Sequence, residues 1–231
     1  MKLNTHRVKN IRVNSYIDEK KLKLSQEYFV LAFLKYMFPS KYKDLLHGDR
    51  PDLQGGNVFV EVTALDTYKD MQASKEFAKY IADGDERRIK TIEGTGNALR
   101  SIETLNATSM YSGGGYNFES DYELLEKRIC EKVDKAKGYE INNRTPELAL
   151  VKEDRPLQEW FEKISNSLET IVKNQDVYET VYILFPNGCI YVEKGEAPNI
   201  IELNQDEYIC LKTIGRMTAE DEITTDDEEW N

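Results

Sequence analysis

Three acidic residues in the first third of the chain lie in segments where a carboxylate, if buried, needs a positively charged partner. Glu27 is the only acid between Lys20 and Lys43, and it lies in an apolar segment that is typical of a helix. Asp52 follows a proline in a turn-rich segment, and Glu61 lies in a run of β-branched and aromatic residues that predicts a strand. A buried carboxylate is costly unless a metal ion, arginine or lysine compensates it. The three acids are therefore the candidate chemical centre.

The predicted strand decides which side chains can share a site with Glu61. Alternation along residues 57–63 puts three valines on one face and Phe59, Glu61 and Thr63 on the other. Asp52, in the preceding turn, can reach the face that carries Glu61. Two carboxylates with backbone and water oxygens form a ligand set that suits Mg²⁺ or Mn²⁺. Such an ion can polarise a phosphate and lower the pKa of an attacking water.

Each acid also has an ordinary structural interpretation. Glu27 is compatible with a helix edge beside solvent, Asp52 with a common turn after proline, and Glu61 with a solvated edge strand. The combination and order of the three acids carry more weight than any one of them.

That order resembles the PD-(D/E)XK nuclease superfamily, whose members have the restriction-endonuclease-like fold. In that family a helix Glu is followed by a Pro-Asp pair, a strand Glu and a Lys two residues further on. Glu27, Pro51-Asp52 and Glu61 match, whereas Thr63 stands where the family has its Lys. The segment resembles members whose strand motif ends in Thr and whose basic residue comes from elsewhere. The resemblance covers residues 21–65 well and the later elements more loosely.

The missing lysine needs a substitute, and a helix expected over residues 120–137 offers one. Lys132 flanks the apolar face of this helix, and Lys135 lies about one turn further on. The segment is similar to the lysine-bearing second helix of such nucleases, in which a lysine can point back at the strand carboxylates. We expect Lys132 first and Lys135 second, with Lys69 as another candidate because it closely follows the strand. Plain solvation is the alternative for any lysine on a charged helix.

Charge and composition limit the class of protein. The chain has 231 residues, of which 40% are hydrophobic and 32% charged, and this excludes a wholly disordered chain. A net charge of −11 argues against a phosphate-binding partner. However, residues 196–231 hold eleven acids against two bases, whereas residues 1–50 hold eleven bases against five acids. The acidity belongs mostly to the C-terminal end and does not exclude nucleic acid.

Helical and strand patterns interleave along the chain, which predicts an α/β fold. The resemblance implies a restriction-endonuclease-like central mixed β-sheet flanked by α-helices. We expect a nuclease-like core over residues 1–195 with a loop insertion at about 93–118. An acidic segment over residues 196–231 follows, with about the last 14 residues flexible. The expected helices cover residues 21–38, 70–92, 120–137 and 156–173, and the expected strands cover residues 57–63, 147–151, 178–185 and 189–193.

The sequence indicates a cytoplasmic protein without a membrane partner. No run of about 18 apolar residues is present, as a membrane-spanning helix needs, and the N-terminus has no apolar signal region. Three widely separated cysteines suit a reducing compartment and favour neither a disulfide framework nor a zinc cluster.

The resemblance implies a Mg²⁺-dependent (or Mn²⁺-dependent) nuclease that hydrolyses phosphodiester bonds, with DNA favoured over RNA. It also implies a restriction, phage or defence setting. Asp52 and Glu61 would bind the metal, Glu27 would be an accessory ligand, and Lys132 or Lys135 would stabilise developing charge. Many such nucleases act as homodimers so that two sites cut two strands.

Two other functions are compatible with the sequence. The first is a catalytically inactive relative that binds nucleic acid or protein, which the departure at Thr63 favours. The second is an interaction protein whose acidic C-terminal segment competes with nucleic acid for a basic surface.

Overall fold

The computed structural model describes residues 3, 19–66, 72–73, 75–76, 79–80, 83–95, 118–139, 143–152 and 157–220. The chain divides into two compact units. The larger unit contains Glu19–Leu65 and the chain from Leu125 onward, and the smaller unit contains Asp66–Leu124. All five predicted site residues belong to the larger unit. Lys69 and the acidic residues 221–231 lie outside the described residues.

Seven strands of the larger unit form one mixed sheet in the order in which they occur along the chain. The three central strands β3, β4 and β5 run parallel, and the other neighbouring pairs are antiparallel. This arrangement confirms the expected α/β fold with a mixed sheet flanked by helices. The strands are β1 (Leu46–His47), β2 (Leu53–Gly55), β3 (Val58–Ala64), β4 (Thr145–Val151), β5 (Thr180–Phe185), β6 (Gly188–Glu193) and β7 (Asn199–Glu202).

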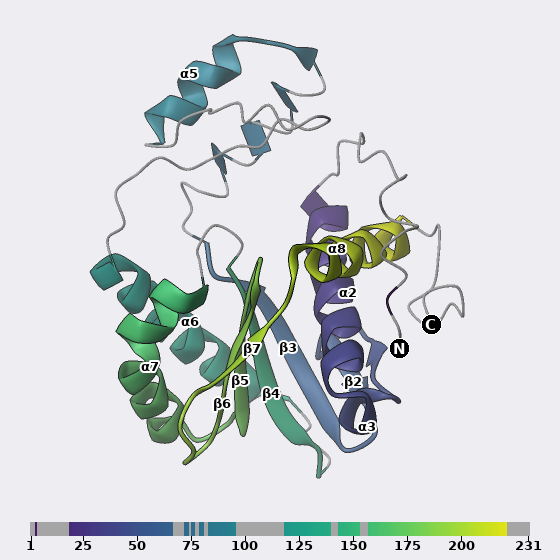
Figure 1. Cartoon of the computed structure of the whole chain (residues 1–231), viewed down its shortest axis with the longest axis vertical. Coiled ribbons are helices and arrows are strands. Elements are labelled where there is room, and N and C mark those ends of the chain that lie inside the picture. The colour runs from purple at the N-terminus through teal and green to yellow at the C-terminus, as the bar shows by residue number, and fades with distance from the viewer. Residues whose placement is uncertain are drawn as a thin grey trace. The chain divides into compact units, whose positions relative to one another are not determined.

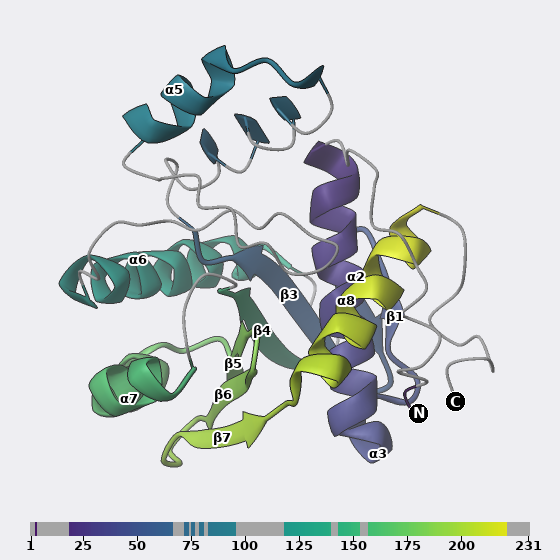
Figure 2. The same ribbon diagram turned by 45° about the horizontal axis from the view of Figure 1, so that its top comes forward.

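Helices cover both faces of this sheet (Figures 1 and 2). The pair α2 and α8 lies on one face, and α6 and α7 lie on the other. Parallel neighbours need a crossover connection, and α6 and α7 supply those from β3 to β4 and from β4 to β5. The described helices are α2 (Glu19–Met37), α3 (Pro39–Tyr42), α5 (Arg87–Gly94), α6 (Phe118–Ala136), α7 (Leu157–Asn174) and α8 (Gln205–Ala219).

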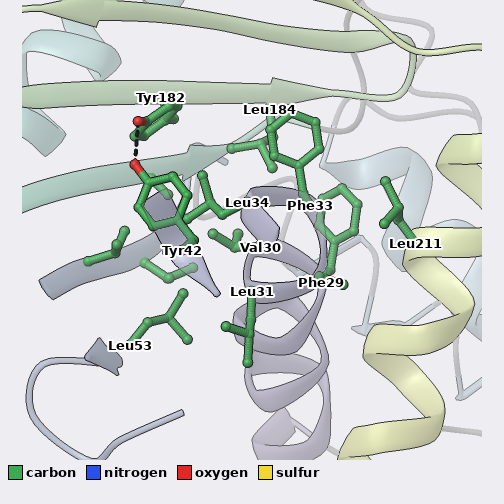
Figure 3. Close-up of a cluster of buried hydrophobic side chains, with 14 of the residues drawn as sticks. Phe29, Val30, Leu31, Phe33, Leu34, Tyr42, Leu53, Tyr182, Leu184 and Leu211 are labelled. Carbon is green, nitrogen blue, oxygen red and sulfur yellow. Dashed lines mark hydrogen bonds between the residues drawn. The ribbon is translucent and has the colours of Figure 1, made fainter. Parts of the chain in front are cut away.

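The main core lies between the sheet and the α2–α8 pair (Figure 3). Every side chain from Phe29 to Leu34 is at most 1% exposed, because α2 packs against the sheet on one side and against α8 on the other. Burial on both sides is what an apolar run such as residues 29–34 requires. α8 and β7 follow residue 195, so this part of the expected acidic segment belongs to the same sheet and core.

The turn-rich segment that contains Asp52 forms the short antiparallel pair β1–β2. This pair carries His47 on its outer strand and ends beside Asp52. Its position at the edge of the sheet, next to β3, brings the turn residues close to Glu61. None of the helices described by the structure is long and apolar enough to cross a membrane.

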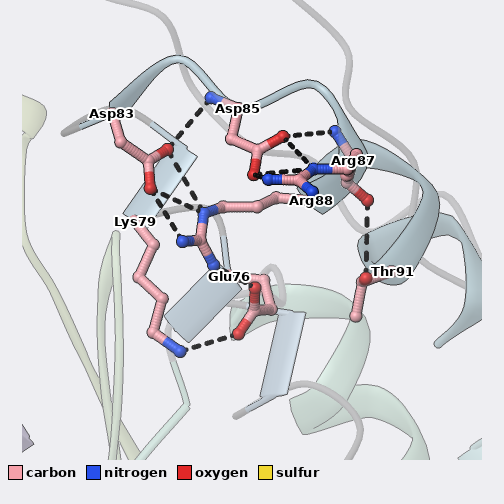
Figure 4. Close-up of polar contacts among 7 residues, drawn as sticks. All are labelled: Glu76, Lys79, Asp83, Asp85, Arg87, Arg88 and Thr91. Atoms are coloured by element: carbon pink, nitrogen blue, oxygen red, sulfur yellow. Dashed lines mark hydrogen bonds and ion pairs between the residues drawn. The ribbon is translucent and has the colours of Figure 1, made fainter.

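The smaller unit contains α5 and a cluster of ion pairs on its surface (Figure 4). Arg88 donates to Glu76 and Asp83, and Arg87 donates to Asp85, with N–O distances of 2.7–2.8 Å for the closest contacts. The hydrogen bonds from the side chain and backbone of Arg87 lower the pKa of Asp85 to about 2. Both arginines are therefore paired with acids of their own unit.

Candidate active site

Glu61 lies in the third of seven strands and is 1% exposed. It points to the face of the sheet that α6 covers, as Phe59 does. The ring centroids of Phe59 and Tyr139 lie 6.2 Å apart on this face. Val60 points to the opposite face and packs in the core against α2. The predicted alternation is therefore confirmed, and the alternative of a solvated edge strand is wrong for Glu61.

Two lysines from α6 and a tyrosine just after it surround the Glu61 carboxylate. Lys132 Nζ and Lys135 Nζ donate to Oε1 at 2.8 and 2.5 Å, and Tyr139 Oη donates to Oε2 at 3.0 Å. The spacing of three and four residues places these side chains on one side of the chain as it leaves the helix. The structure thus brings both predicted lysines to the predicted strand carboxylate. Tyr139 is an additional contact that the sequence did not single out.

Glu61 and Lys135 each favour the charged form of the other. Burial tends to raise the pKa of Glu61, but the hydrogen bonds from Lys132 and Lys135 outweigh it and hold that pKa below its ordinary value. Burial tends to lower the pKa of Lys135, and the hydrogen bond to Glu61 more than reverses this, so the pKa is raised. At neutral pH the cluster therefore holds an ionised carboxylate beside charged lysine.

Asp52 lies next to Glu61 across the β2–β3 hairpin. The register pairs Leu53 with Val60, so the next positions along the two strands are Asp52 and Glu61. Asp52 is 5% exposed, and its Oδ2 accepts a hydrogen bond from the backbone N–H of Val62 at 2.8 Å. Burial and then the negative charge of Glu61 raise the pKa of Asp52. The two predicted carboxylates are thus neighbours, and the negative charge of each disfavours ionisation of the other.

Glu27 lies on α2 and is also 5% exposed, so the alternative of a solvated helix edge is wrong. Its Oε2 lies 2.6 Å from His47 Nε2, and its Oε1 lies 2.7 Å from Lys23 Nζ. Lys23 Nζ is also 3.4 Å from Asp52 Oδ1 and so links two of the predicted acids. Burial raises the pKa of Glu27, but the bonds from His47 and Lys23 outweigh it and lower that pKa.

His47 and Lys23 are site residues that the sequence reasoning missed. Lys23 lies four residues before Glu27, a spacing that places both on one helix face, so its signal was present. His47 had no comparable signal, because its approach to Glu27 depends on how β1 pairs with β2.

Another buried acid, Glu147, was also missed. Glu147 in β4 is fully buried; its carboxylate accepts from Tyr42 Oη at 2.7 Å and pairs with Lys41 Nζ at 2.7 Å. The Tyr42 and Tyr182 hydroxyls lie 2.5 Å apart (Figure 3). Burial raises the pKa of Glu147 despite these partners. This network lies on the face of the sheet that α2 and α3 cover, away from the face that carries Glu61.

The donor set fits a metal bound by few protein ligands. Within the described ranges, no group of three or more His, Cys, Asp or Glu side chains is placed to hold a metal ion. Mg²⁺ commonly binds one or two carboxylates and keeps waters or substrate phosphates as its other ligands. Asp52 and Glu61 are such a pair, since both are buried oxygen donors at adjacent positions. Glu27 is linked to them through Lys23.

No family model, curated protein or solved structure matches the chain. The function therefore has to be argued from the chemistry of the site itself.

The lowered pKa of Glu61 predicts a pH-dependent stability. Because this pKa lies below the ordinary value of 4.5, Glu61 contributes stability that is fully present above that pH and is lost as the pH falls through the lowered pKa. The contribution of Asp52 to stability depends on pH in the opposite direction. Because its pKa is raised, this contribution is present at low pH and is lost as the pH rises through the raised pKa.

We therefore expect the difference in free energy of unfolding between wild type and Glu61→Gln to shrink between about pH 7 and about pH 3. Urea denaturation at both pH values measures this difference. For Asp52→Asn we expect the pH dependence of the difference to have the opposite sign. A Glu61→Gln difference that stays constant over this range would contradict the lowered pKa.

Proposed function

We propose that the chain is a divalent-metal-dependent nuclease of the PD-(D/E)XK type. The observation that carries the proposal is the buried strand carboxylate Glu61, which two lysines of α6 contact from one side while Asp52 flanks it on the neighbouring strand. Metal-binding carboxylates beside lysine ammoniums are what hydrolysis of a phosphodiester requires, because the phosphate and its transition state are anionic.

Asp52 and Glu61 would hold Mg²⁺ or Mn²⁺, with Glu27 as an accessory group. The ion, when bound, supplies polarisation of the phosphate and lowers the pKa of the attacking water. Water adds across a P–O bond, which leaves one end with a phosphate and the other with a hydroxyl. Negative charge grows on the phosphate oxygens during this step, and a lysine ammonium stabilises it.

The two lysines suit different parts of this task. The Lys132 side chain is 16% exposed and is held against Glu61, so it keeps the carboxylate ionised and oriented. The Lys135 side chain is 49% exposed and can turn toward a phosphate oxygen. Together they supply the positive charge that Thr63 cannot provide. This favours an active enzyme over the alternative of a catalytically inactive relative that binds nucleic acid or protein.

DNA is the proposed substrate, in a restriction, phage or defence setting and in the cytoplasm, by analogy with the resembled family. A homodimer is the proposed assembly for cutting two strands. The rival function, an interaction protein whose acidic segment competes with nucleic acid, involves residues 196–231, of which 221–231 lie outside the described part of the chain. The site acids distinguish the two functions, since an interaction protein does not need them.

Cleavage assays test the proposal. Purified protein is incubated with supercoiled plasmid, single-stranded DNA and RNA in Mg²⁺, in Mn²⁺ and in EDTA. We expect ion-dependent cleavage that falls at least about a hundredfold in Asp52→Asn. Asp49→Asn, an exposed aspartate of the same loop, is the matched control and should cleave as wild type does. Equal cleavage in EDTA, or equal cleavage by Asp52→Asn, would show that the activity does not come from this site.

A further inference from the structure

Lys23 occupies an unusual place between two buried acids. Its Nζ lies 2.7 Å from Glu27 Oε1 and 3.4 Å from Asp52 Oδ1. The side chains of both acids are 6% exposed, whereas the side chain of Lys23 is 67% exposed. The ammonium therefore sits between two carboxylates while most of the side chain stays in solvent.

The charges of the site balance without an added ion. Three buried carboxylates face three lysines: Lys132 and Lys135 pair with Glu61, and Lys23 pairs with the other two acids. A divalent ion that entered beside Glu27 and Asp52 would meet the Lys23 ammonium within a few ångströms. Two cations at that distance repel each other. The incoming ion therefore binds more strongly once the ammonium has moved away.

Lys23 is the cation that can leave at small cost. Its flexible, exposed stem allows the ammonium to move into water, where it is well hydrated. Glu27 keeps its orientation when Lys23 departs, because His47 Nε2 still contacts its other oxygen at 2.6 Å. Asp52 likewise keeps the hydrogen bond from the Val62 backbone N–H.

We propose that Lys23 is an internal cation that holds the place of the divalent ion that Asp52 and Glu61 would bind, with Glu27 as accessory group, and that it regulates the entry of that ion. This inference rests on the proposed metal-dependent function and adds a regulatory residue to it. The free protein then binds the ion weakly, because each binding event has to displace Lys23. Removal of the ammonium frees the two carboxylates and tightens metal binding.

A titration of the full chain with Mn²⁺ alone, without nucleic acid, tests this proposal. Calorimetry and the electron paramagnetic resonance signal of free Mn²⁺ both report the affinity. We expect Lys23→Met to bind Mn²⁺ at least about tenfold more tightly than wild type, because one nearby positive charge is gone. Lys23→Arg keeps the charge and should show no such gain. The matched control is Lys127→Met, which removes a lysine of α6 that pairs with Glu131 and should leave the affinity unchanged.

The outcomes separate this inference from the proposed function. If Lys23→Met binds Mn²⁺ no more tightly than wild type, while Asp52→Asn still loses binding, Lys23 is not a placeholder and the metal site stands. If Lys23→Arg tightens binding as much as Lys23→Met, charge is not the cause and the proposal fails. If the Lys23→Met gain appears but the wild type cleaves no nucleic acid, the placeholder role stands and the nuclease proposal fails.

Discussion

Replacing Glu61 with glutamine should lower metal-dependent cleavage by about a hundredfold to a thousandfold and should also weaken the fold. The amide is a poorer metal ligand than the carboxylate, so the catalytic ion loses one of its two proposed protein ligands. The same change leaves Lys132 and Lys135 facing a neutral group at a position that is 1% exposed. Removing one partner of a buried ion pair typically costs about 3–5 kcal/mol. We expect about 1–3 kcal/mol here, because Lys135 is half-exposed and regains water.

Two measurements separate these effects. Cleavage assays give the loss of activity under conditions in which circular dichroism shows the variant to be folded, and urea denaturation gives the loss of stability. Glu126→Gln, which changes an exposed glutamate of α6, is the matched control and should alter neither quantity. A folded Glu61→Gln variant that cleaves like wild type would remove Glu61 from the proposed site.

Gly215→Ala should destabilise the protein by about 1–3 kcal/mol, even though alanine is the better helix former. α8 crosses α2 at this glycine. An added Cβ would lie 2.6 Å from the backbone N of Phe29 and 2.7 Å from the backbone O of Ser25. Backbone atoms cannot move aside as a flexible side chain can, so the two helices have to separate. α2 also carries Glu27 and Lys23, so a shift of this helix should weaken Mn²⁺ binding as well.

Gly94→Ala is the control for this prediction. Gly94 ends α5 and has open space around the position of a Cβ. Alanine there should leave the free energy of unfolding unchanged or raise it by up to about 1 kcal/mol. Thermal and urea denaturation of both variants provide the comparison. An unchanged stability in Gly215→Ala would mean that the α2–α8 contact is looser than its geometry indicates.

The elements that carry the site were predictable because their residue patterns are local. The alternation around Glu61 identified a strand, and the structure then decided that its acid is buried and not on a solvated edge. The uninterrupted apolar segment around Glu27 identified a buried helix, and the observed α2 differs from the expected one by one or two residues at each end. The lysines of α6 were predictable as a group, since a charged residue beside an apolar stripe can reach the sheet below it.

The contacts between distant segments were less predictable. His47 reaches Glu27 because β1 folds back on β2 at the edge of the sheet, a pairing that is set by the hairpin turn and the sheet together. Glu147 became a buried acid because β4 is a central strand covered on both faces, and its partners Tyr42 and Lys41 come from a segment about a hundred residues earlier. The spacing of residues along the chain does not indicate which distant segments come into contact.

The amino-acid sequence by itself determined the strand that carries Glu61 and the helices that carry Glu27 and the α6 lysines, and it marked three acids that need a cation once they are buried. These properties follow from side-chain periodicity and from the cost of burying a charge, both of which act over a few residues. Only the tertiary structure decided which cations meet which acids. It placed Lys132 and Lys135 together on Glu61, and Lys23 between Glu27 and Asp52. The physical reason is that ion pairing acts over a few ångströms, and packing of the helices on the sheet sets those distances.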